Sequence, residues 1–376
     1  MTVHIIYSNY LNPIGSDITV GGVQTYITAL AKVVKACGFN LFLYQKSSTD
    51  FEKEYNGMKI FGVNCTGRFE FQVKYSLYNR CRKIFNNEED ILIWGTDALI
   101  VKNHGLKRTI AIQHGIAWDR PEKKHTGFYY NWRIIRKMYD SFKIINRISY
   151  VNCLVCVDHN YMNWHRSLVP LIQQKMVVIP NFTKIPDNVD FERHQDEHVE
   201  IIFARRFFEV RGTRILSEAM IKILDQYPNV SLTISGTGPD EEYLKKVFKC
   251  NNRVCFKKYD SSDALEVHKN QHIAVVPSVG SEGTSLSLLE AMAAGCVVVC
   301  TNVGGMTNIV MDGHNGMICL PTSEDLYLAL RKVIDDKQLR MKLSKSAFQT
   351  VLDSFSLNRW EKLWMDVLNG MSGDLQ

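Results

Sequence analysis

The sequence lacks a long hydrophobic segment. Although 45% of its 376 residues are hydrophobic, no run approaches the roughly 18 apolar residues that a membrane-spanning helix needs. Residues 2–7 have neither the positive flank nor the apolar stretch of a secretory signal and are typical of a short buried strand. We therefore expect a cytoplasmic protein that does not cross a bilayer, with peripheral attachment to the inner face of the plasma membrane left open.

Disulfide and zinc patterns are also missing. In a chain without an export signal, the ten cysteines predict reduced core residues rather than a disulfide framework. Cys153 and Cys156 form one close pair, but they lie in an apolar, strand-like run. No second Cys/His pair with zinc-like spacing accompanies them. Burial in a strand therefore explains this pair without metal or redox chemistry.

Charge is close to balanced and no segment is of low complexity. A net charge of +6 over 376 residues does not require a nucleic-acid partner, although a local basic surface facing phosphates or anionic lipid stays compatible with it. The length fits two domains of ordinary size, each with its own core. Composition therefore indicates a globular protein with two domains.

Short apolar runs alternate with longer amphipathic ones, as in parallel strands joined by crossover helices. In the first half we expect strands at 3–7, 40–44, 58–63, 91–94, 109–113, 152–157 and 176–180, with helices at 22–36, 71–85 and 127–148. In the second half we expect strands at 200–204, 230–235, 254–257, 273–277 and 297–301, with helices at 214–226, 241–249 and 286–294.

These patterns predict an α/β protein of two doubly wound, Rossmann-like domains that face each other across a cleft. A polar, acidic stretch separates the two halves, and beyond Ser323 the pattern is wholly helical. Trp360 and Trp364 share one face of the last helix, which must pack against something. The predicted parts are a first domain at 1–183, a linker at 184–198, a second domain at 199–354, and a C-terminal helix and tail at 355–376 that cross back to the first domain.

The segment from Pro277 to Gly295 runs from a strand through a glycine-bearing loop into a helix. Backbone N–H groups at the helix start, around Gly283, Thr284, Ser285 and Leu286, are unpaired within the helix and suit an anion. Glu282 lies before the helix and Glu290 two turns along it. Apolar neighbours surround Glu290, where a carboxylate needs a partner. A functional carboxylate pair is therefore favoured over two solvated glutamates.

This segment resembles the Glu-x7-Glu motif of the retaining GT-B-fold glycosyltransferases of family 4, which build bacterial lipopolysaccharide, capsule and glycolipids. Further resemblances follow in the family's order: Gly21-Gly22-Val23, Val178-Ile-Pro-Asn181, Phe203 to Gly212, Gly236-Thr-Gly-Pro239, Val303-Gly-Gly305 and Asp312 to Gly316. The resemblance is strong from Glu200 to Pro321 and thinner before it. It implies a GT-B fold and a transferase that moves a hexose from a nucleotide-diphosphate sugar.

The resemblance also assigns roles. Glu282 would hold hydroxyls of the transferred sugar and Glu290 the ribose, while Arg206 and Arg211 would clamp the diphosphate as it leaves. The family commonly has glycine where this chain has Arg205, and lysine where it has Arg211. The chain has no Asp-x-Asp motif, so these arginines would replace a metal ion, and no cofactor is expected.

Other matching positions complete the expected site. Gly21 and Gly22 follow the first strand, where a missing Cβ lets the backbone approach a ligand closely. His114 ends a candidate strand and would contact the sugar or acceptor, with a structural role equally open. Gly238 lies in the Gly-x-Gly-Pro turn, and Tyr259 ends the segment 256–259 that would meet the donor base.

The implied reaction is retaining: the departing phosphate oxygen takes the acceptor proton on the face that the acceptor attacks. A UDP-sugar is the preferred donor, with GDP-mannose next, and the acceptor would be a glycan or a lipid-linked glycan of bacterial surface polysaccharide synthesis. Two alternatives stay open, a GT-B-fold sugar-nucleotide epimerase and a non-enzymatic sugar-binding protein.

Residues 129–147 interleave aromatic and basic side chains. This pattern suits an amphipathic helix that lies on an anionic membrane surface or grips a lipid pyrophosphate. A core helix with a solvated basic edge is an equally good interpretation of the sequence.

Overall fold

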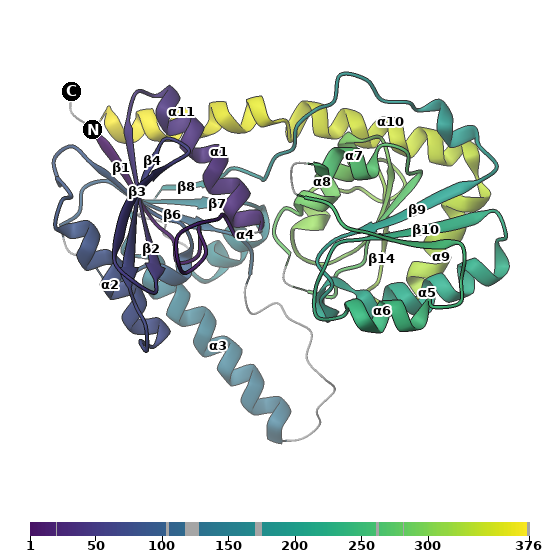
Figure 1. The fold of residues 1–376 in the computed structure, drawn as a ribbon, viewed down its shortest axis with the longest axis horizontal. Coiled ribbons are helices and arrows are strands. Elements are labelled where there is room, and N and C mark those ends of the chain that lie inside the picture. Colours follow the sequence, from purple (N-terminus) through teal and green to yellow (C-terminus); the bar gives the residue numbers. More distant parts are fainter. Residues whose placement is uncertain are drawn as a thin grey trace. The chain divides into compact units, whose positions relative to one another are not determined.

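The chain folds into two compact units. The computed structural model describes residues 1–19, 21–102, 105–116, 128–169, 175–260, 263–280 and 282–373. Unit 1 comprises Met1–His114, His125–Pro180 and Asn358–Gln376, and unit 2 comprises Gly115–Lys124 and Asn181–Leu357 (Figure 1).

In its described part, unit 1 is built on an eight-stranded sheet with the order β3-β4-β2-β1-β5-β6-β7-β8. The strands are β1 (Thr2–Ile6), β2 (Asn40–Ser47), β3 (Phe51–Tyr55), β4 (Met58–Asn64), β5 (Ile91–Trp94), β6 (Thr109–Gln113), β7 (Cys153–Cys156) and β8 (Lys175–Val178). All neighbours are parallel except β3, which pairs antiparallel with β4. Strands such as β5, Ile-Leu-Ile-Trp, are buried throughout, as expected for a parallel sheet covered on both faces.

The edge strand β3 differs from the inner strands. Its sequence is Phe-Glu-Lys-Glu-Tyr, and Glu52 and Glu54 are exposed. Charged side chains on an edge strand prevent another chain from pairing with it. The absence of an apolar run explains why the sequence pattern did not predict this strand.

The described helices of unit 1 are α1 (Gly22–Ala36), α2 (Glu70–Arg82), α3 (Phe128–Ile148), α4 (His159–Leu168) and α11 (Leu357–Ser372), with a short turn η1 (Asp97–Leu99). The helix α4 was not predicted. Asp158 precedes it, and its carboxylate accepts the backbone N–H of Asn160 at 2.9 Å and so caps the helix.

The last helix, α11, returns to unit 1 and lies beside α1 (Figure 1). Trp360 and Trp364 are buried, and both contact the ring of Tyr26 on α1 edge-on. The indole N–H of Trp364 donates to the Tyr26 hydroxyl at 2.8 Å. The predicted crossing of the C-terminal helix to the first domain is confirmed.

Unit 2 contains a six-stranded parallel sheet with the order β11-β10-β9-β12-β13-β14. The strands are β9 (Val199–Ala204), β10 (Val230–Ser235), β11 (Val254–Lys257), β12 (Ile273–Val276), β13 (Val297–Thr301) and β14 (Met317–Cys319). The chain moves outward from β9 to β11 and then returns to place β12 on the other side of β9. The carboxyl ends of β9 and β12 therefore form a topological switch point, where open α/β sheets bind ligands.

Helices cover both faces of this sheet. They are α5 (Thr213–Gln226), α6 (Glu241–Val247), α7 (Ala264–His268), α8 (Leu286–Ala293), α9 (Ser323–Asp335) and α10 (Lys337–Ser354), with the short turns η2 (Glu192–Gln195), η3 (Glu209–Arg211) and η5 (Gly304–Asn308). Ile201 and Phe203 of β9 pack in a cluster with α5 and α9, whereas Ile202 and Ala204 pack in another with α8 and α10. The alternation of side chains along β9 thus supplies both cores.

The predicted architecture of two Rossmann-like α/β domains is confirmed, with differences at small elements. The strand β14 and the helix α7 were not predicted, because three and five residues give too little periodicity. Residues 184–198, predicted as a linker, lie in unit 2. There Arg193 and His194 are buried and bond to the backbone oxygens of Ala294 and Gly295. These two side chains therefore satisfy backbone groups, although most other polar residues of the stretch are exposed.

All ten cysteines are free, and seven of them are buried, including Cys153 and Cys156 in β7. Cys250 and Cys255 are exposed, which differs from the expected core location. Within the described ranges, every helix is too short or too polar to span a membrane.

The packing of α11 predicts a large effect of one tryptophan. Replacing Trp364 by alanine removes a buried indole and its bond to Tyr26, so we expect Trp364→Ala to lower the free energy of unfolding by about 3 to 5 kcal/mol. Urea denaturation followed by circular dichroism measures this. The matched control is Trp132→Ala, which removes an exposed indole on α3. Equal losses in the two variants would contradict the packing role of Trp364.

Candidate active site

The predicted carboxylate Glu282 lies in the loop that follows β12, at the switch point of unit 2. The loop after β9 lies beside it, because the N–H of Val279 donates to the oxygen of Val210 at 3.0 Å. The two loops carry most of the charged residues that the sequence singled out. Their position follows from strand order alone, since β9 and β12 are neighbours.

Two arginines and a serine converge on Glu282. Arg205 and Arg211 each form an ion pair with its Oε1 atom, and the Ser278 hydroxyl donates to the same oxygen. Arg205 also donates to the Ser278 hydroxyl at 2.6 Å. The side chains of Arg205 and Glu282 are only 6% and 7% exposed, whereas that of Arg211 is 22% exposed. Arg205 is thus the inner partner, and Arg211 reaches the surface.

This cluster keeps Glu282 ionised. Burial alone raises the pKa of the Glu282 carboxyl, but the guanidinium groups of Arg205 and Arg211 and the Ser278 hydroxyl together hold that pKa below its usual value. Burial also lowers the pKa of Arg205, and Glu282 opposes that change. The result is a buried carboxylate in a fixed orientation, with an excess of one positive charge among the three groups.

The loop that holds Glu282 is fixed from several sides. The backbone N–H of Gly305 donates to the backbone carbonyl oxygen of Glu282 at 2.9 Å. The side-chain amide of Asn181 donates to the backbone carbonyl oxygen of Thr284 at 2.6 Å. Gly304 has a φ of 55°, and a Cβ on it would lie 2.1 Å from the backbone carbonyl oxygen of Glu282. Only glycine permits this approach. The Val303-Gly-Gly305 segment therefore acts as a support for the Glu282 loop.

The helix α8 begins directly after this loop, as predicted. Thr284 and Ser285 are buried, Leu286 is the first helical residue, and no side chain caps the helix start. The partial positive charge of these N–H groups faces the same region as Glu282 and Gly283. The arrangement suits an anionic ligand group.

Glu290 lies on α8, and its electrostatic neighbour is Tyr259. Burial raises the pKa of the Glu290 carboxyl to about 7. Burial also raises the pKa of the Tyr259 hydroxyl, and the charge on Glu290 adds to this effect while Arg205 opposes it. Tyr259 therefore lies within the fields of both Arg205 and Glu290. A cavity of about 310 Å³ is lined by Tyr259 together with Lys257 and Lys258.

Arg206 is placed differently from Arg211. It is exposed, and its guanidinium lies 5.7 Å from the ring centre of Phe208. Sequence reasoning singled out Arg206 and treated Arg205 as a substituted glycine, yet Arg205 is the residue that reaches Glu282. Arg205 directly follows β9, and this position at the end of a central strand was the available signal. Ser278, the second residue after β12, was also missed.

Gly238 belongs to the turn after β10, which packs against the loop after β9. A Cβ on Gly238 would lie 2.5 Å from the Phe207 oxygen, and the N–H of Phe207 donates to the Thr237 oxygen at 2.9 Å. The turn therefore holds the backbone of the arginine loop in place.

The remaining predicted residues lie in unit 1. Gly21 precedes α1 and Gly22 is its first residue. His114 follows β6, and its Nε2–H donates to the Gly95 oxygen at 2.9 Å. Its ring contacts Tyr26 edge-on at 5.2 Å. Burial lowers the pKa of His114 to about 4, with the Gly95 bond opposing it. His114 is thus neutral near pH 7, and its Nδ1 is an acceptor.

These groups define what the site of unit 2 can do. It offers an ionised carboxylate for hydroxyl groups, guanidinium groups and helix N–H groups for an anion, and a second carboxylate, Glu290, within α8. Among the residues described, no three His, Cys, Asp or Glu side chains are grouped as metal ligands.

Residues 185–350 match the profile of a family described as "Glycosyl transferases group 1". This range contains both arginines, Glu282 and Glu290. The matched range lies within unit 2.

Curated relatives match about half of the chain. An uncharacterised glycosyltransferase of Methanocaldococcus jannaschii is 29% identical over 191 residues, which cover 49% of this chain and 48% of the relative. A phosphatidyl-myo-inositol mannosyltransferase of Mycolicibacterium smegmatis is 25% identical over 170 residues, covering 44% of each chain. The match to these two relatives thus spans about half of their length.

The whole chain resembles solved glycosyltransferase structures. HepE from Anabaena, solved in complex with UDP and glucose, has a TM-score of 0.71 at 16% identity, with 98% of this chain and 100% of that chain covered. This likeness shows the fold. The chain has the GT-B fold of two Rossmann-like domains, and the second contains the range that is similar to the group 1 family.

The raised pKa of Glu290 predicts a stability that depends on pH. Between pH 4.5, the usual pKa of a glutamate, and about pH 7, the native state holds a proton that the unfolded chain has released. The native state therefore loses stability as the pH rises through this window. We expect Glu290→Gln to gain stability over the unmodified chain between about pH 5 and pH 8, by up to ~3 kcal/mol.

Urea titrations across this pH range measure the difference. The matched control is Glu218→Gln, which changes an exposed glutamate on α5. A difference between Glu290→Gln and the unmodified chain that stays constant with pH would show that Glu290 has an ordinary pKa.

Proposed function

We propose that this protein is a retaining glycosyltransferase that moves a hexose from a nucleotide-diphosphate sugar to a glycan or lipid-linked acceptor. The observation that supports it is the convergence of Arg205, Arg211 and Ser278 on the buried carboxylate Glu282, inside a glycosyl transferases group 1 domain. A buried ion-pair cluster often contributes no more stability than apolar packing would, so its presence here favours a functional role over a purely structural one.

In this proposal, unit 2 binds the donor. The Oε2 atom of Glu282 accepts hydrogen bonds from hydroxyl groups of the transferred sugar, while the ion pairs at Oε1 fix the orientation of the carboxylate. Arg211 and Arg206 bind the diphosphate together with the N–H groups of Gly283, Thr284 and Ser285. Glu290 binds the ribose, and the backbone of 256–259 meets the base beside the cavity at Tyr259.

The chemical step needs little from the protein beyond position and charge. The acceptor oxygen bonds to the anomeric carbon as the bond from that carbon to the diphosphate oxygen breaks. The acceptor proton passes to the departing phosphate oxygen on the same face, so the configuration is retained. Arg206 and Arg211 stabilise the negative charge on the leaving diphosphate, and no metal ion is required in this scheme. His114 and the Gly21-Gly22 turn in unit 1 contact the sugar or the acceptor.

UDP-sugars are the preferred donors and GDP-mannose is the next choice. The solved HepE complex contains UDP, and the related Mycolicibacterium protein is a mannosyltransferase by name. We place the reaction in bacterial surface polysaccharide synthesis at the cytoplasmic side of the plasma membrane, as the sequence resemblance implies.

The donor site makes a direct prediction. A ligand that binds only the native state raises the melting temperature, so we expect UDP-glucose or GDP-mannose to stabilise the protein. Arg206→Ala and Glu282→Gln should remove this stabilisation and reduce transfer by about 10²-fold or more. Arg206 is exposed, so Arg206→Ala should leave the ligand-free melting temperature unchanged.

Arg359→Ala, at an exposed arginine of α11, is the matched control and should behave like the unmodified chain. Full transfer activity in Arg206→Ala would contradict its assignment. Conversion of a UDP-sugar to its epimer without any acceptor would contradict the transferase proposal itself.

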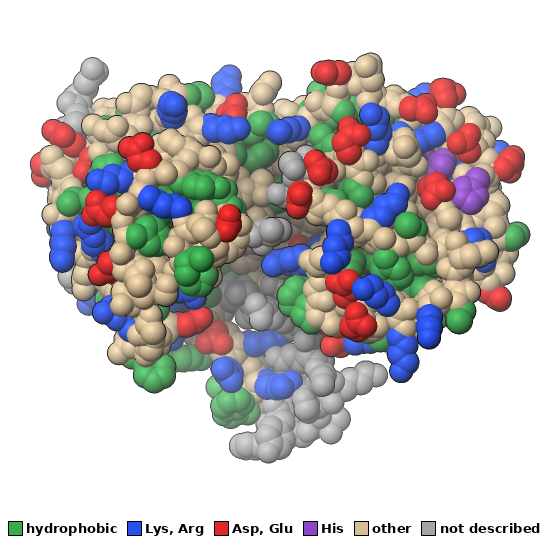
Figure 2. All heavy atoms as spheres, viewed as in Figure 1, with side chains coloured by type: hydrophobic (Ala, Val, Ile, Leu, Met, Phe, Trp, Pro, Cys, Tyr) green, Lys and Arg blue, Asp and Glu red, His purple; other side chains and the backbone are tan. Residues whose placement is uncertain are grey.

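A membrane contact through α3 is part of the proposal. Trp132, Ile135, Tyr139 and Phe142 recur at helical spacing and are 51% to 63% exposed. They form one outward apolar face, which favours the surface-helix interpretation over a core helix. The helix carries five basic residues and one acidic residue, Asp140. In the lower part of Figure 2, hydrophobic side chains lie beside Lys and Arg where Figure 1 draws α3.

Vesicle binding tests this contact. We expect sedimentation with phosphatidylglycerol vesicles at low salt, because apolar insertion and charge attraction act together, and little with phosphatidylcholine vesicles. Phe142→Ser should weaken binding about tenfold or more. The control is Ile221→Ser, an exposed apolar residue on α5. Unchanged binding of Phe142→Ser would remove α3 from the contact, and no sedimentation at all would remove the contact.

A further inference from the structure

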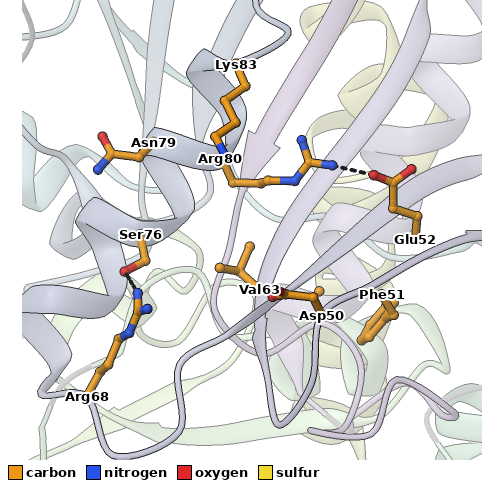
Figure 3. Close-up of a pocket in the computed structure, with 10 residues that line it drawn as sticks. Asp50, Phe51, Glu52, Val63, Arg68, Ser76, Asn79, Arg80 and Lys83 are labelled. Atoms are coloured by element: carbon orange, nitrogen blue, oxygen red, sulfur yellow. Dashed lines mark hydrogen bonds and ion pairs between the residues drawn. The ribbon is translucent and has the colours of Figure 1, made fainter.

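A second cavity lies in unit 1, and none of the residues that line it is assigned to the reaction. It has a volume of about 640 Å³ and lies between α2 and the β3–β4 edge of the sheet. Figure 3 shows its side chains arranged around Val63. The residues Ser76, Asn79 and Arg80 come from α2 and Lys83 directly follows it, while Asp50 precedes β3 and Phe51 and Glu52 begin it.

The floor of this cavity is apolar and rigid. Val63 and the Phe51 ring contribute to it. A Cβ on Gly62 would lie 2.2 Å from the Phe51 ring, and one on Gly15 would lie 2.6 Å from it. The ring therefore occupies space that two glycines leave open. Such a floor suits the C–H face of a sugar ring, which is apolar while its edge carries hydroxyl groups.

The rim carries polar side chains that are already oriented. Arg68 donates to the Ser76 hydroxyl on one side, and Arg80 forms an ion pair with Glu52 on the opposite side (Figure 3). Asp50 accepts the backbone N–H of Asn64 at 2.6 Å. Oriented donors and acceptors around an apolar floor reduce the ordering cost of binding a hydroxylated ligand.

The charge around the cavity is not balanced. Three cationic side chains line it, those of Arg68, Arg80 and Lys83, against two carboxylates. Glu52 is shared between Arg80 and Lys59. Within the described part of the chain, no carboxylate lies in ion-pair range of Arg68 or Lys83. An anionic group on the ligand would supply the missing charge, and the planar fork of Arg68 matches a carboxylate or phosphate.

The geometry points to a binding subsite for an acidic saccharide, one that carries a carboxylate or a phosphate. The subsite deepens the proposed function, on which its role rests, by naming the class of acceptor. Four strand spacings separate β4 from β6, the strand that His114 follows, which is about 19 Å along the sheet. The subsite therefore holds a sugar remote from the acceptor end that reacts, and the acceptor is an oligosaccharide rather than a single sugar.

Calorimetric titration of the full chain tests this subsite with three probes. Hyaluronan tetrasaccharide carries carboxylates, glucose 6-phosphate carries a phosphate, and maltotetraose is neutral. We expect at least one acidic probe to bind about tenfold or more tightly than maltotetraose. Arg68→Ala and Lys83→Ala should each weaken that binding about five- to tenfold. Which acidic probe binds decides between carboxylate and phosphate recognition.

Two further variants complete the design. Lys332→Ala, at an exposed lysine of α9, should bind the acidic probes as the unmodified chain does. Glu282→Gln should also bind them normally, so a failure of the transferase proposal and a failure of the subsite give different results. Equal binding of neutral and acidic probes, unchanged binding of both Arg68→Ala and Lys83→Ala, or no binding of either acidic probe would each overturn the subsite.

Discussion

The buried ion-pair cluster of Glu282 with Arg205 and Arg211 is the interaction on which the candidate site depends. An isolated carboxylate at this depth would take up a proton, because burial disfavours its charged form. The two guanidinium groups and the Ser278 hydroxyl reverse that preference and lower its pKa. Such a cluster contributes little net stability compared with apolar packing, yet removing one partner leaves a buried charge uncompensated. The cluster therefore fits a binding role, in which it keeps the Glu282 carboxylate ionised and oriented, better than a stabilising role.

The rest of unit 2 supports this cluster. The strand order brings the carboxyl ends of β9 and β12 together, so that two loops separated by some 70 residues become neighbours. Close backbone contacts at Gly304 and Gly238 then fix the two loops. Rigid strands and tight turns together hold the charged side chains of the two loops close to one another.

In unit 1, the packing around His114 depends on one residue, Tyr26. Tyr26 on α1 contacts His114 on one side and both tryptophans of α11 on the other. The end of the chain thus helps to fix the ring of His114, whose neutral state follows from burial. The outward apolar face of α3 and the cationic cavity beside α2 lie on the same unit, where acceptors of varied chemistry are expected to bind.

The sequence alone determined the fold class and the positions of most strands and helices. It also located Glu282 before a helix and Glu290 within it. These features depend on local periodicity and on the placement of glycine and proline. It also predicted Arg211 as part of the site. Only the tertiary structure decided that Arg205 rather than Arg206 pairs with Glu282, since adjacent residues after a strand point in different directions and the register of the loop selects one. It likewise decided that the apolar face of α3 points to solvent and that Arg68 and Lys83 line one cavity, because burial and charge balance depend on which distant segments pack together.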